Sequence, residues 1–387
     1  MTAAGPNILL AAGEPSGDLH GAGLARALLA RFPNARLWGL GGPRMRAAGV
    51  HLLADLDDLA VMGFVEVAGR LPFFLRLWKR VRQAMRQERP DLVIPIDYPG
   101  FNVRLARAAR KTGTRVLYYI VPQVWAWHRS RIPKLVAATD RLAVILPFEE
   151  PLFAEAGGKA VFVGHPLLDA EPEAVPRPEF CTKHGFDPAR PILALFPGSR
   201  AQEIERHLVM FAEAAERLVA LRPDVQPLIA AGSAIRAESF GAVRVPHTDE
   251  GWGLLQHAAI ALVKSGTSTL QAALTRTPMV VTYRTSALTF ALAKRLVKID
   301  HVALVNLVAG RRLVPEVLQE DATPDTLAAE LEVLLTEGPK RREVVDGLTH
   351  VRAALQPSGG SGTVADRVAS IAVELLTASA SRARIGS

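Results

Sequence analysis

Cysteine is almost absent from this sequence of 387 residues, in which Cys181 stands alone. A single cysteine excludes a fold held together by disulfides and fits a reducing compartment. Long hydrophobic runs are missing too, because charge-free stretches such as 116–127 are shorter than the ~18 residues that a membrane-spanning helix needs. We therefore expect the short apolar run 8–12 to be a first strand rather than a signal peptide.

Two nucleotide-binding motifs are missing as well. The sequence contains no Gly-x-x-x-x-Gly-Lys-Ser/Thr loop, and no Gly-x-Gly-x-x-Gly follows the first expected strand. The second absence argues against a nicotinamide-dependent enzyme. Aromatic residues are only 6% of the chain and lie mostly in apolar runs, which argues against nucleic acid as a partner.

Basic residues, in contrast, are in excess. Lys and Arg number 46 against 38 Asp and Glu, which gives a net charge of +8. This balance attracts anions, and nucleic acid, anionic lipid headgroups and phosphorylated substrates all remain open on composition alone. With 49% apolar and 22% charged residues, the chain has the make-up of a globular protein of roughly two to three domains.

Short apolar runs alternate with helical patterns along the whole chain, which predicts α/β halves with parallel sheets. A Pro- and Glu-rich segment, 166–178, separates two such series and reads as a linker. Before it we expect strands at 8–12, 36–41, 91–97, 115–120, 141–146 and 160–164. After it we expect strands at 191–196, 227–231, 242–245, 260–263 and 279–283. The predicted architecture is two doubly wound domains, 1–170 and 188–355, facing a cleft, with a helix at 361–377 and a frayed tail at 378–387.

Two turns of the first half carry polar groups where ligands bind to parallel sheets, at the carboxyl ends of strands. The turn 13–18 reads Gly-Glu-Pro-Ser-Gly-Asp, and helix capping by Ser16 or Asp18 is the alternative to a ligand role. The second turn begins with Asp97, after the buried run 92–96. Because Asn102 can cap the helix that follows, Asp97 is not needed as the N-cap, and we regard it as a candidate general base.

Two turns of the second half could bind phosphate. Gly198-Ser199-Arg200 offers backbone N–H groups, a hydroxyl and a guanidinium, which matches phosphate oxygens. Ser265-Gly266-Thr267 places hydroxyls and a glycine at another strand-to-helix junction. Each alone could be a capped helix with nothing bound, but two such junctions in one half favour a nucleotide site.

A basic amphipathic pattern follows residue 64. Apolar side chains at helical spacing alternate with six basic residues between 70 and 86, which is typical of a helix lying in a bilayer interface, although a core-facing helix carries a similar stripe. The segment 288–298 repeats the pattern. We predict a membrane patch formed by Val65, Val67, Leu71, Phe74, Leu75 and Trp78.

Ten segments together resemble one family, the lipid-A-disaccharide synthases, which are glycosyltransferases of the two-Rossmann GT-B fold. The resemblance spans residues 8 to about 320 and is carried by 13–18, 42–45, 60–67, 97–102, 122–127, 146–149, 163–166, 197–200, 265–267 and 306–311. Of these, Val124-Trp125-Ala126-Trp127 and Ala60-Val61-Met62-Gly63 are specific, whereas many GT-B enzymes share Ser-Gly-Thr. The GT-B fold implies a C-terminal helix, 361–387, that returns to the N-terminal domain.

The resemblance implies a reaction in the synthesis of lipid A, a lipid of the Gram-negative outer membrane. UDP-2,3-diacylglucosamine would donate its sugar to 2,3-diacylglucosamine 1-phosphate, giving a β-1,6-linked disaccharide phosphate and UDP, with inversion and without a cofactor. No Asp-x-Asp motif accompanies the phosphate turns, so no metal is expected there. The chain would be cytoplasmic and peripheral on the inner membrane, and the sequence leaves open whether it forms a homodimer.

The resemblance also implies residue roles. Asp97 would deprotonate the acceptor 6-hydroxyl, and Glu14 and Ser16 would line the acceptor side. The donor and its UDP would be held by Gly198, Ser199, Arg200, Ser265, Gly266, Thr267, Gln271, Asn306 and Arg311. The family places Glu at position 271, so Gln271 is a departure, and the neighbouring Lys264 is either a diphosphate contact or a solvated charge.

Two other classes remain open from the residues. A nucleotide-sugar 2-epimerase shares the two-half fold and an Arg-bearing phosphate turn, but acts on a soluble UDP-sugar and needs no membrane patch. A non-catalytic protein that binds anions or a membrane surface would need no base at Asp97.

Overall fold

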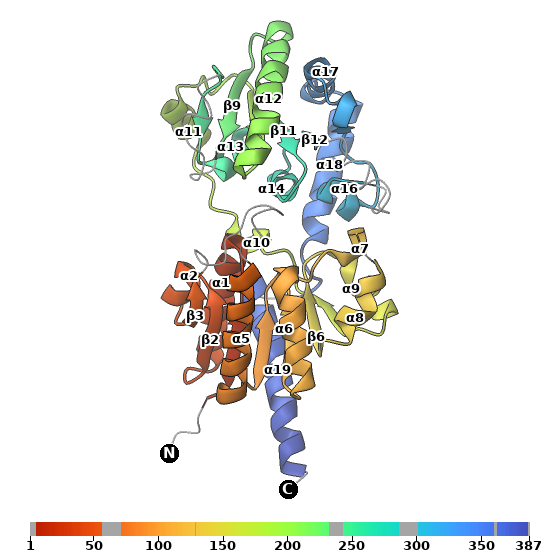
Figure 1. Cartoon of the computed structure of the whole chain (residues 1–387). Coiled ribbons are helices and arrows are strands. Elements are labelled where there is room, and N and C mark those ends of the chain that lie inside the picture. The colour runs from red at the N-terminus through yellow and green to blue at the C-terminus, as the bar shows by residue number, and fades with distance from the viewer. Residues whose placement is uncertain are drawn as a thin grey trace. The chain divides into compact units, whose positions relative to one another are not determined.

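The computed structural model describes residues 5–55, 71–127, 129–231, 243–285, 301–359 and 362–385. The chain divides into two compact units, one of residues 1–169 with 356–387 and the other of residues 170–355. Each unit is built on its own parallel sheet (Figure 1). The linker predicted at 166–178 contains the boundary between the units, which falls within the short helix α10 (Leu167–Ala170).

The first unit has a seven-stranded sheet in the order β3-β2-β1-β4-β5-β6-β7. Its elements are β1 (Asn7–Ala11), α1 (Pro15–Arg31), β2 (Arg36–Gly41), α2 (Pro43–Ala47), β3 (His51–Asp55), α5 (Leu71–Glu88), β4 (Leu92–Pro95), α6 (Pro99–Lys111), β5 (Arg115–Tyr119), α7 (Val124–Trp127), η1 (Arg129–Arg131), α8 (Ile132–Val136), β6 (Arg141–Val144), α9 (Glu149–Glu155), β7 (Ala160–Phe162) and α19 (Val364–Ile385).

The second unit repeats this winding in a six-stranded sheet, β10-β9-β8-β11-β12-β13. Its elements are α11 (Arg177–His184), β8 (Ile192–Phe196), α12 (Ala201–Leu221), β9 (Gln226–Ala230), β10 (His247–Thr248), α13 (Gly251–His257), β11 (Ile260–Lys264), α14 (Ser268–Leu274), β12 (Met279–Tyr283), α16 (Leu304–Ala309), β13 (Glu316–Leu318), η3 (Gln319–Asp321), α17 (Pro324–Leu335) and α18 (Pro339–Ala354).

The α/β prediction with doubly wound parallel sheets is confirmed. Predicted strands 36–41 and 279–283 coincide with β2 and β12. The strand predicted at 242–245 is wrong over 243–245, which has no regular structure, and the nearest strand is β10. The final helix begins at Val364 and continues to Ile385, into the tail that was expected to fray.

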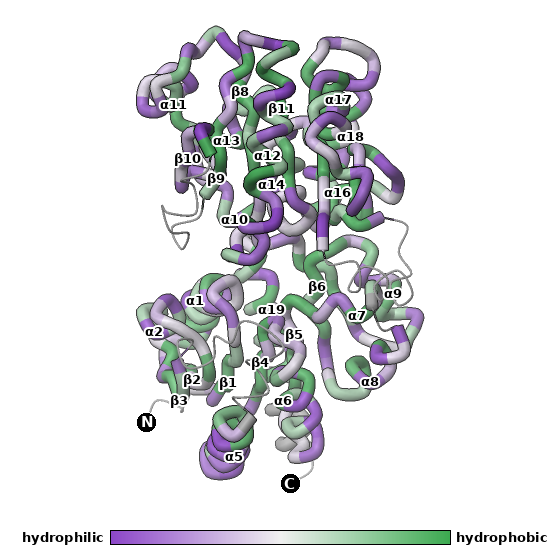
Figure 2. Tube along the Cα trace, turned by 45° about the horizontal axis from the view of Figure 1, so that its top comes forward, coloured by the Kyte–Doolittle hydropathy of each residue, from purple (hydrophilic) through white to green (hydrophobic). Residues whose placement is uncertain are grey.

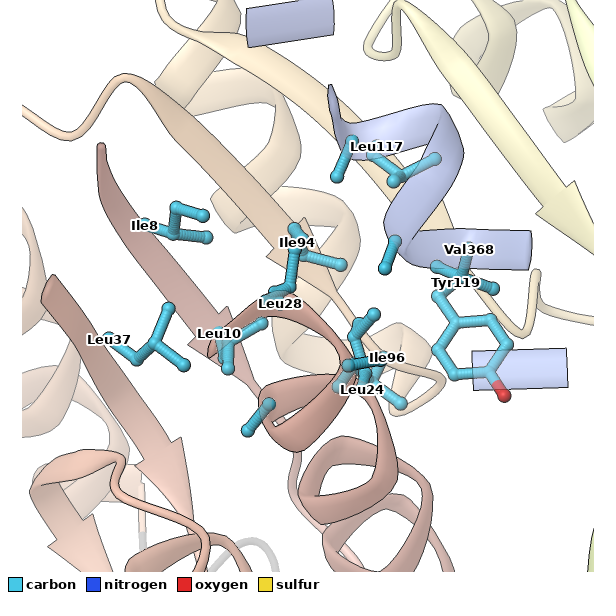
Figure 3. Close-up of a cluster of buried hydrophobic side chains, with 14 of the residues drawn as sticks. Ile8, Leu10, Leu24, Leu28, Leu37, Ile94, Ile96, Leu117, Tyr119 and Val368 are labelled. Carbon is cyan, nitrogen blue, oxygen red and sulfur yellow. The ribbon is translucent and has the colours of Figure 1, made fainter. Parts of the chain in front are cut away.

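The core of the first unit joins β1, β4 and β5 to α1 and α19. Buried Ile8, Leu10, Ile94 and Leu117 pack with Leu24 and Leu28 of α1 and with Val368 of α19 (Figure 3). Alternate residues of each buried strand reach this face because side chains alternate along a strand. Burial of aliphatic side chains of this size is worth about 1.5–3 kcal/mol each.

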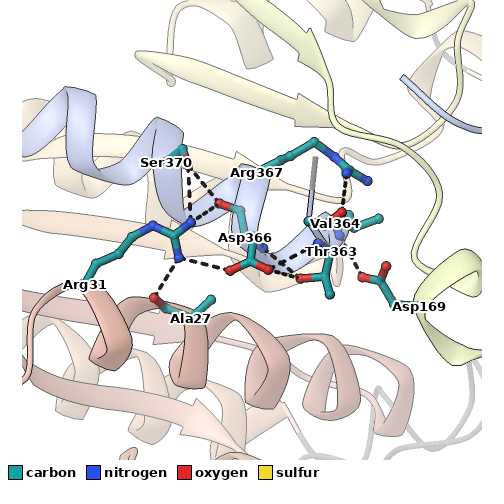
Figure 4. Close-up of polar contacts among 9 residues, drawn as sticks. Ala27, Arg31, Asp169, Thr363, Val364, Asp366, Arg367 and Ser370 are labelled. Carbon is teal, nitrogen blue, oxygen red and sulfur yellow. Dashed lines mark hydrogen bonds and ion pairs between the residues drawn. The ribbon is translucent and has the colours of Figure 1, made fainter. Parts of the chain in front are cut away.

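Polar contacts join α19 to the same unit. The Arg31 guanidinium donates to the Asp366 carboxylate at 3.1 Å and to the Asp366 carbonyl at 3.0 Å, and Arg367 donates to the Val163 carbonyl at 2.7 Å (Figure 4). The backbone N–H of Val364, at the start of α19, donates to Asp169 at 2.7 Å. The helix therefore binds the first unit although nearly 200 residues of the second unit separate it from β7 in the sequence.

Candidate functional site

The four polar turns found in the sequence all lie beside the points where the strand order reverses. In the first unit the order reverses between β1 and β4, which precede the turns at 13–18 and at Asp97. In the second unit it reverses between β8 and β11, which precede the turns at 198–200 and 265–267. Ligands of doubly wound sheets bind at these reversals, outside the carboxyl ends of the strands.

The two turns of the first unit are in direct contact. A Cβ on Gly13 would lie only 2.3 Å from the Tyr98 ring, so glycine is required for this approach. Glu14 and Asp97 are close enough for the charge of Glu14 to raise the pKa of Asp97. The structure thus places the predicted base and the predicted acceptor-side carboxylate at one site.

The backbone at Asp97 is strained and held by its neighbours. Asp97 and Tyr98 have positive φ angles of 47° and 50°, a conformation that costs a non-glycine residue of order 1–3 kcal/mol. The Asp97 carbonyl accepts hydrogen bonds from the Tyr118 hydroxyl at 2.8 Å and from Asn102 Nδ2 at 2.9 Å. The Asp97 N–H donates to the Tyr119 carbonyl at 3.0 Å. These contacts stabilise the turn and fix the backbone position from which the Asp97 side chain extends.

Asn102 is not the helix cap that the sequence suggested. The helix α6 already begins at Pro99, and Asn102 lies buried inside its first turns. Its Nδ2 also donates to the carbonyls of Ala11 at 2.8 Å and Ile96 at 3.1 Å. It therefore joins the ends of β1 and β4 to the Asp97 turn, a role that local sequence cannot reveal.

The Asp97 carboxyl group is half-buried. Burial, followed by the negative charge of Glu14, raises its pKa to about 6, against the opposing hydrogen bond from the Tyr98 backbone. A carboxyl group with a pKa in this range is mostly ionised at neutral pH and still able to accept a proton, as a general base requires. It lines a cavity of about 370 Å³ within the first unit.

Asp18 and Ser16 are not N-caps of α1 either. The helix begins at Pro15, and the buried Asp18 carboxylate accepts from the backbone N–H groups of Gly42 at 2.8 Å, Met45 at 3.0 Å and Arg44 at 3.1 Å. Asp18 thus satisfies the first turn of a different helix, α2, and links two of the family-like segments. Ser16 is exposed, and its contact with the acceptor stays a prediction.

In the second unit, the predicted phosphate turn already surrounds an internal carboxylate. Glu203 accepts from the Ser199 N–H at 3.1 Å and from Lys264 Nζ at 2.8 Å, and it lies 3.7 Å from the Arg200 guanidinium. Gly198 has φ of 138°, and a Cβ there would lie 2.5 Å from Glu203. The pKa of Glu203 is raised by burial, but the hydrogen bond and charge of Lys264 outweigh this and lower it overall.

Lys264 is therefore not a solvated surface charge. It pairs with Glu203 and lies over the Tyr283 ring, with Nζ 5.4 Å from the ring centre. Glu203 is not among the residues predicted from the sequence, although it stands four residues after Ser199 in the first turn of α12. Three groups that could donate to an anion converge on this carboxylate.

The remaining predicted donor residues occupy different environments. Ser265 Oγ donates to the Val302 carbonyl at 3.0 Å, Gly266 and Gln271 are half-buried and Thr267 is exposed. Asn306 is buried, with its amide bonded to Leu313, Val314 and Glu316. Arg311 is exposed and paired with Glu343 at 2.7 Å. The structure therefore gives Asn306 an internal bonding role, and contact of Asn306 or Arg311 with a donor stays a prediction.

The predicted membrane patch lies partly outside the described residues. Val65, Val67 and the 288–298 segment are not among them, and neither is the side chain of Leu71. Along α5, Leu77, Val81 and Met85 are buried, whereas Leu75 of the predicted patch is 57% exposed. Contact of the patch with lipid stays a prediction. Phe74 and Trp78 are half-buried, and Trp78 packs edge-on against Phe101 of α6 at 5.5 Å.

Basic side chains of α5 and α6 gather beside Trp78. A hollow of about 480 Å³ is lined by Trp78 and Met85 and by four Arg and one Lys, which are Arg82, Arg86, Arg104, Arg107 and Lys111. Figure 2 shows the tube of α5 mostly in the purple of hydrophilic residues. Among the described helices, none is long and apolar enough to cross a membrane.

Comparison with known proteins agrees with the resemblance. The family model described as lipid-A-disaccharide synthetase matches residues 8–363. The lipid-A-disaccharide synthase of Geobacter sulfurreducens is 41% identical over 376 residues, which cover 95% of this chain and 97% of that protein.

Solved structures show the fold alone. CalG4, the calicheamicin glycosyltransferase, aligns with a TM-score of 0.62 at 16% identity, over 97% of this chain and 99% of its own. The UDP-GlcNAc 2-epimerase of Neisseria meningitidis bound to UDP-GlcNAc aligns with a TM-score of 0.58 at 11% identity, over 96% of this chain and 98% of its own. Since both classes align similarly, the fold does not choose between them, whereas sequence identity favours the synthases.

Proposed function

We propose that this chain, which belongs to the lipid-A-disaccharide synthetase family, joins two diacylated glucosamine units. UDP-2,3-diacylglucosamine donates its sugar to the 6-hydroxyl of 2,3-diacylglucosamine 1-phosphate, and UDP leaves. The observation that carries the proposal is 41% identity to a lipid-A-disaccharide synthase over nearly the whole of both chains. At that level and coverage, the reacting groups of the family are expected at the matching positions.

In this reaction Asp97 takes the proton of the acceptor 6-hydroxyl as its oxygen attacks the anomeric carbon. The bond from that carbon to the UDP oxygen breaks on the opposite side, so the configuration inverts. Three features support Asp97 as the base: its place at the strand-order reversal, its half-buried carboxyl group and its pKa of about 6. Glu14, whose charge contributes to the raised pKa of Asp97, lies on the acceptor side.

The departing UDP needs positive partners for its diphosphate. We assign this role to the Ser199 backbone N–H, Arg200, Lys264 and the 265–267 turn, which lie at the carboxyl ends of the neighbouring strands β8 and β11. Placed donors of this kind stabilise developing negative charge by about 3 kcal/mol each. The diphosphate would then replace the Glu203 carboxylate among these donors, without a metal ion or cofactor in the proposed mechanism.

Both substrates carry acyl chains, so the enzyme must meet them at a lipid surface. We assign this contact to the exposed Leu75, the half-buried Trp78 and the basic residues of α5 and α6 around it. Arginine and lysine next to an aromatic side chain favour the interface of an anionic bilayer. The proposed location is the cytoplasmic face of the inner membrane, as a peripheral protein.

The decisive assay measures UDP release from UDP-2,3-diacylglucosamine with and without 2,3-diacylglucosamine 1-phosphate. We expect release only with both, together with a disaccharide phosphate product. An Asp97→Asn variant should bind UDP with unchanged affinity, but it should release almost no UDP from UDP-2,3-diacylglucosamine. Formation of a sugar epimer from UDP-N-acetylglucosamine alone would identify an epimerase instead, and full activity of Asp97→Asn would overturn the role of the base.

A further inference from the structure

The cavity that contains the Asp97 carboxyl group is built from segments that the donor site does not use. Its described lining comprises Asp97, Pro99, Ile120, Val121, Pro122, Gln123, Val124, Arg131, Ile145, Leu146 and Glu149, all within the first unit. Its volume of about 370 Å³ lies in the range of small-molecule sites, which begins near 300 Å³.

The wall of this cavity is rigidly assembled from two family-like segments, 122–127 and 146–149. Trp125 Nε1 donates to the buried Glu149 carboxylate at 2.9 Å, and the Trp125 and Phe148 rings meet edge-to-face at 4.9 Å. Glu149 also accepts from the N–H groups of Leu146 at 3.0 Å and Ile145 at 3.2 Å. A buried carboxylate with three donors fixes both loops around the cavity.

The chemistry of the lining is divided into three parts. Asp97 supplies the reactive carboxyl group, and six aliphatic or proline side chains from 120–124 and 145–146 supply an apolar wall. Arg131 is the positive charge of the described lining, at an exposed rim position on η1. Within the described part of the chain, its guanidinium has no hydrogen bond or ion pair, so its donors are available to a ligand.

We propose that this cavity binds the acceptor sugar and that Arg131 binds the acceptor's 1-phosphate. The inference rests on the proposed function and names the binding site of its second substrate. The acceptor carries its 6-hydroxyl on the carbon attached to C5 and its phosphate on C1, and C1 and C5 both flank the ring oxygen. A sugar with its 6-hydroxyl at Asp97 therefore keeps its phosphate within the same small cavity, and Arg131 is the cation of the described lining. A guanidinium meets a phosphate monoester with two parallel hydrogen bonds.

The apolar wall completes the fit to the acceptor. The acyl groups on positions 2 and 3 leave the edge of the sugar ring that faces away from the ring oxygen, and the aliphatic side chains of the lining offer them an apolar surface. A soluble hexose phosphate lacks these chains and would leave that wall in contact with water. The cavity therefore favours an acylated sugar phosphate over its deacylated form.

The test is a set of steady-state measurements in detergent micelles with two acceptors, one carrying the 1-phosphate and one lacking it. With the phosphorylated acceptor, Arg131→Gln should raise the acceptor KM by about 10- to 100-fold, the range of a lost hydrogen bond to a charged group. The donor KM and kcat should change less than twofold. With the acceptor that lacks phosphate, the wild type and Arg131→Gln should behave alike.

Two variants control for general effects. Arg131→Lys keeps the charge but not the paired donors, and should recover part of the acceptor KM. Lys134→Gln removes the same charge from α8, where Lys134 lines a separate hollow with Arg107, Arg110 and Lys111, and should leave the acceptor KM unchanged. An equal penalty of Arg131→Gln on both acceptors would overturn the proposal, and so would an increase in the donor KM alone. Activity of the wild-type enzyme on both substrates tests the proposed function separately.

Discussion

Lys264 and Glu203 form an ion pair of 2.8 Å between Nζ and Oε1 in the turn proposed to hold the UDP diphosphate. The same carboxylate accepts the Ser199 N–H at 3.1 Å, so one acidic side chain occupies donors that a phosphate would use. An internal anion of this kind gives these donors a partner in the absence of a ligand. It also competes with the ligand.

Glu203→Gln should therefore strengthen UDP binding. The amide retains the shape and one acceptor oxygen but removes the charge that holds Lys264. We expect the Kd for UDP, measured by calorimetry, to fall by about tenfold, equivalent to ~1.4 kcal/mol. Glu205→Gln, an exposed substitution on the same helix with the same change in charge, should alter the Kd by less than twofold. Weaker binding by Glu203→Gln would show that Glu203 supports the site rather than competing with UDP.

Gln271→Glu should also tighten UDP binding, through the ribose. A carboxylate accepts hydrogen bonds from hydroxyl groups more strongly than an amide, and the gain is ~1 kcal/mol. The comparison ligand is 2′,3′-dideoxy-UDP, for which the substitution should bring no gain. Calorimetry that shows equal effects on both ligands would place position 271 away from the ribose.

The pH dependence of kcat/KM should follow the ionisation of Asp97. Because its pKa is raised to about 6, the rate should increase as pH rises through 6 and the base loses its proton. Glu14→Gln removes one of the causes of that raised pKa, so the rising limb should move to lower pH. Glu155→Gln, exposed on α9, should leave the limb in place.

The same pKa has a consequence for stability. The pKa of Asp97 is higher in the folded protein than its ordinary value of 3.8, so ionisation of Asp97 opposes folding. The contribution of protonated Asp97 to the free energy of unfolding is fully present below pH 3.8 and is lost as pH rises through 6. Asp97→Asn should therefore flatten the unfolding free energy between these pH values in denaturant titrations.

Tyr118→Phe should reduce kcat without weakening UDP binding. The Tyr118 hydroxyl donates to the Asp97 carbonyl at 2.8 Å and helps to hold the left-handed turn. We expect about a tenfold loss, since a ~1.4 kcal/mol change in the barrier is a factor of ten. Tyr119→Phe is the matched control, because Tyr119 is equally buried and its hydroxyl makes no hydrogen bond within the described residues. Equal losses in both variants would contradict the positioning role.

Vesicle binding should depend on the basic residues of α5 and α6. Each basic side chain near an anionic surface contributes about 1 kcal/mol, so Arg82→Gln with Arg104→Gln should weaken binding to phosphatidylglycerol vesicles by tenfold or more. Arg312→Gln with Arg342→Gln removes the same charge from exposed positions of the second unit and should have little effect. If both pairs lower binding equally, net charge alone attracts the protein to the vesicles.

Local sequence determined the sheets and the turns at their edges. The strands are short apolar runs between turn residues, and the four polar turns directly follow strands, so neighbouring residues alone predicted where ligands could bind. The family resemblance added Gln271, Asn306 and Arg311 and the identity of the substrates, because short segments such as Val124-Trp125-Ala126-Trp127 are specific.

Only the tertiary structure decided which partners those residues meet. Asp18 satisfies the start of α2 and Asn102 joins β1 to the Asp97 turn, although both resemble caps of their own helices. Which residues of α5 are buried, Leu77 or Leu75, is decided by how the helix packs on the rest of the unit. The Glu203 pair with Lys264 and the cavity joining Asp97 to Arg131 unite residues distant in the chain. These hydrogen bonds and packing contacts join residues that are close in space but distant in the chain, so a local sequence pattern does not predict them.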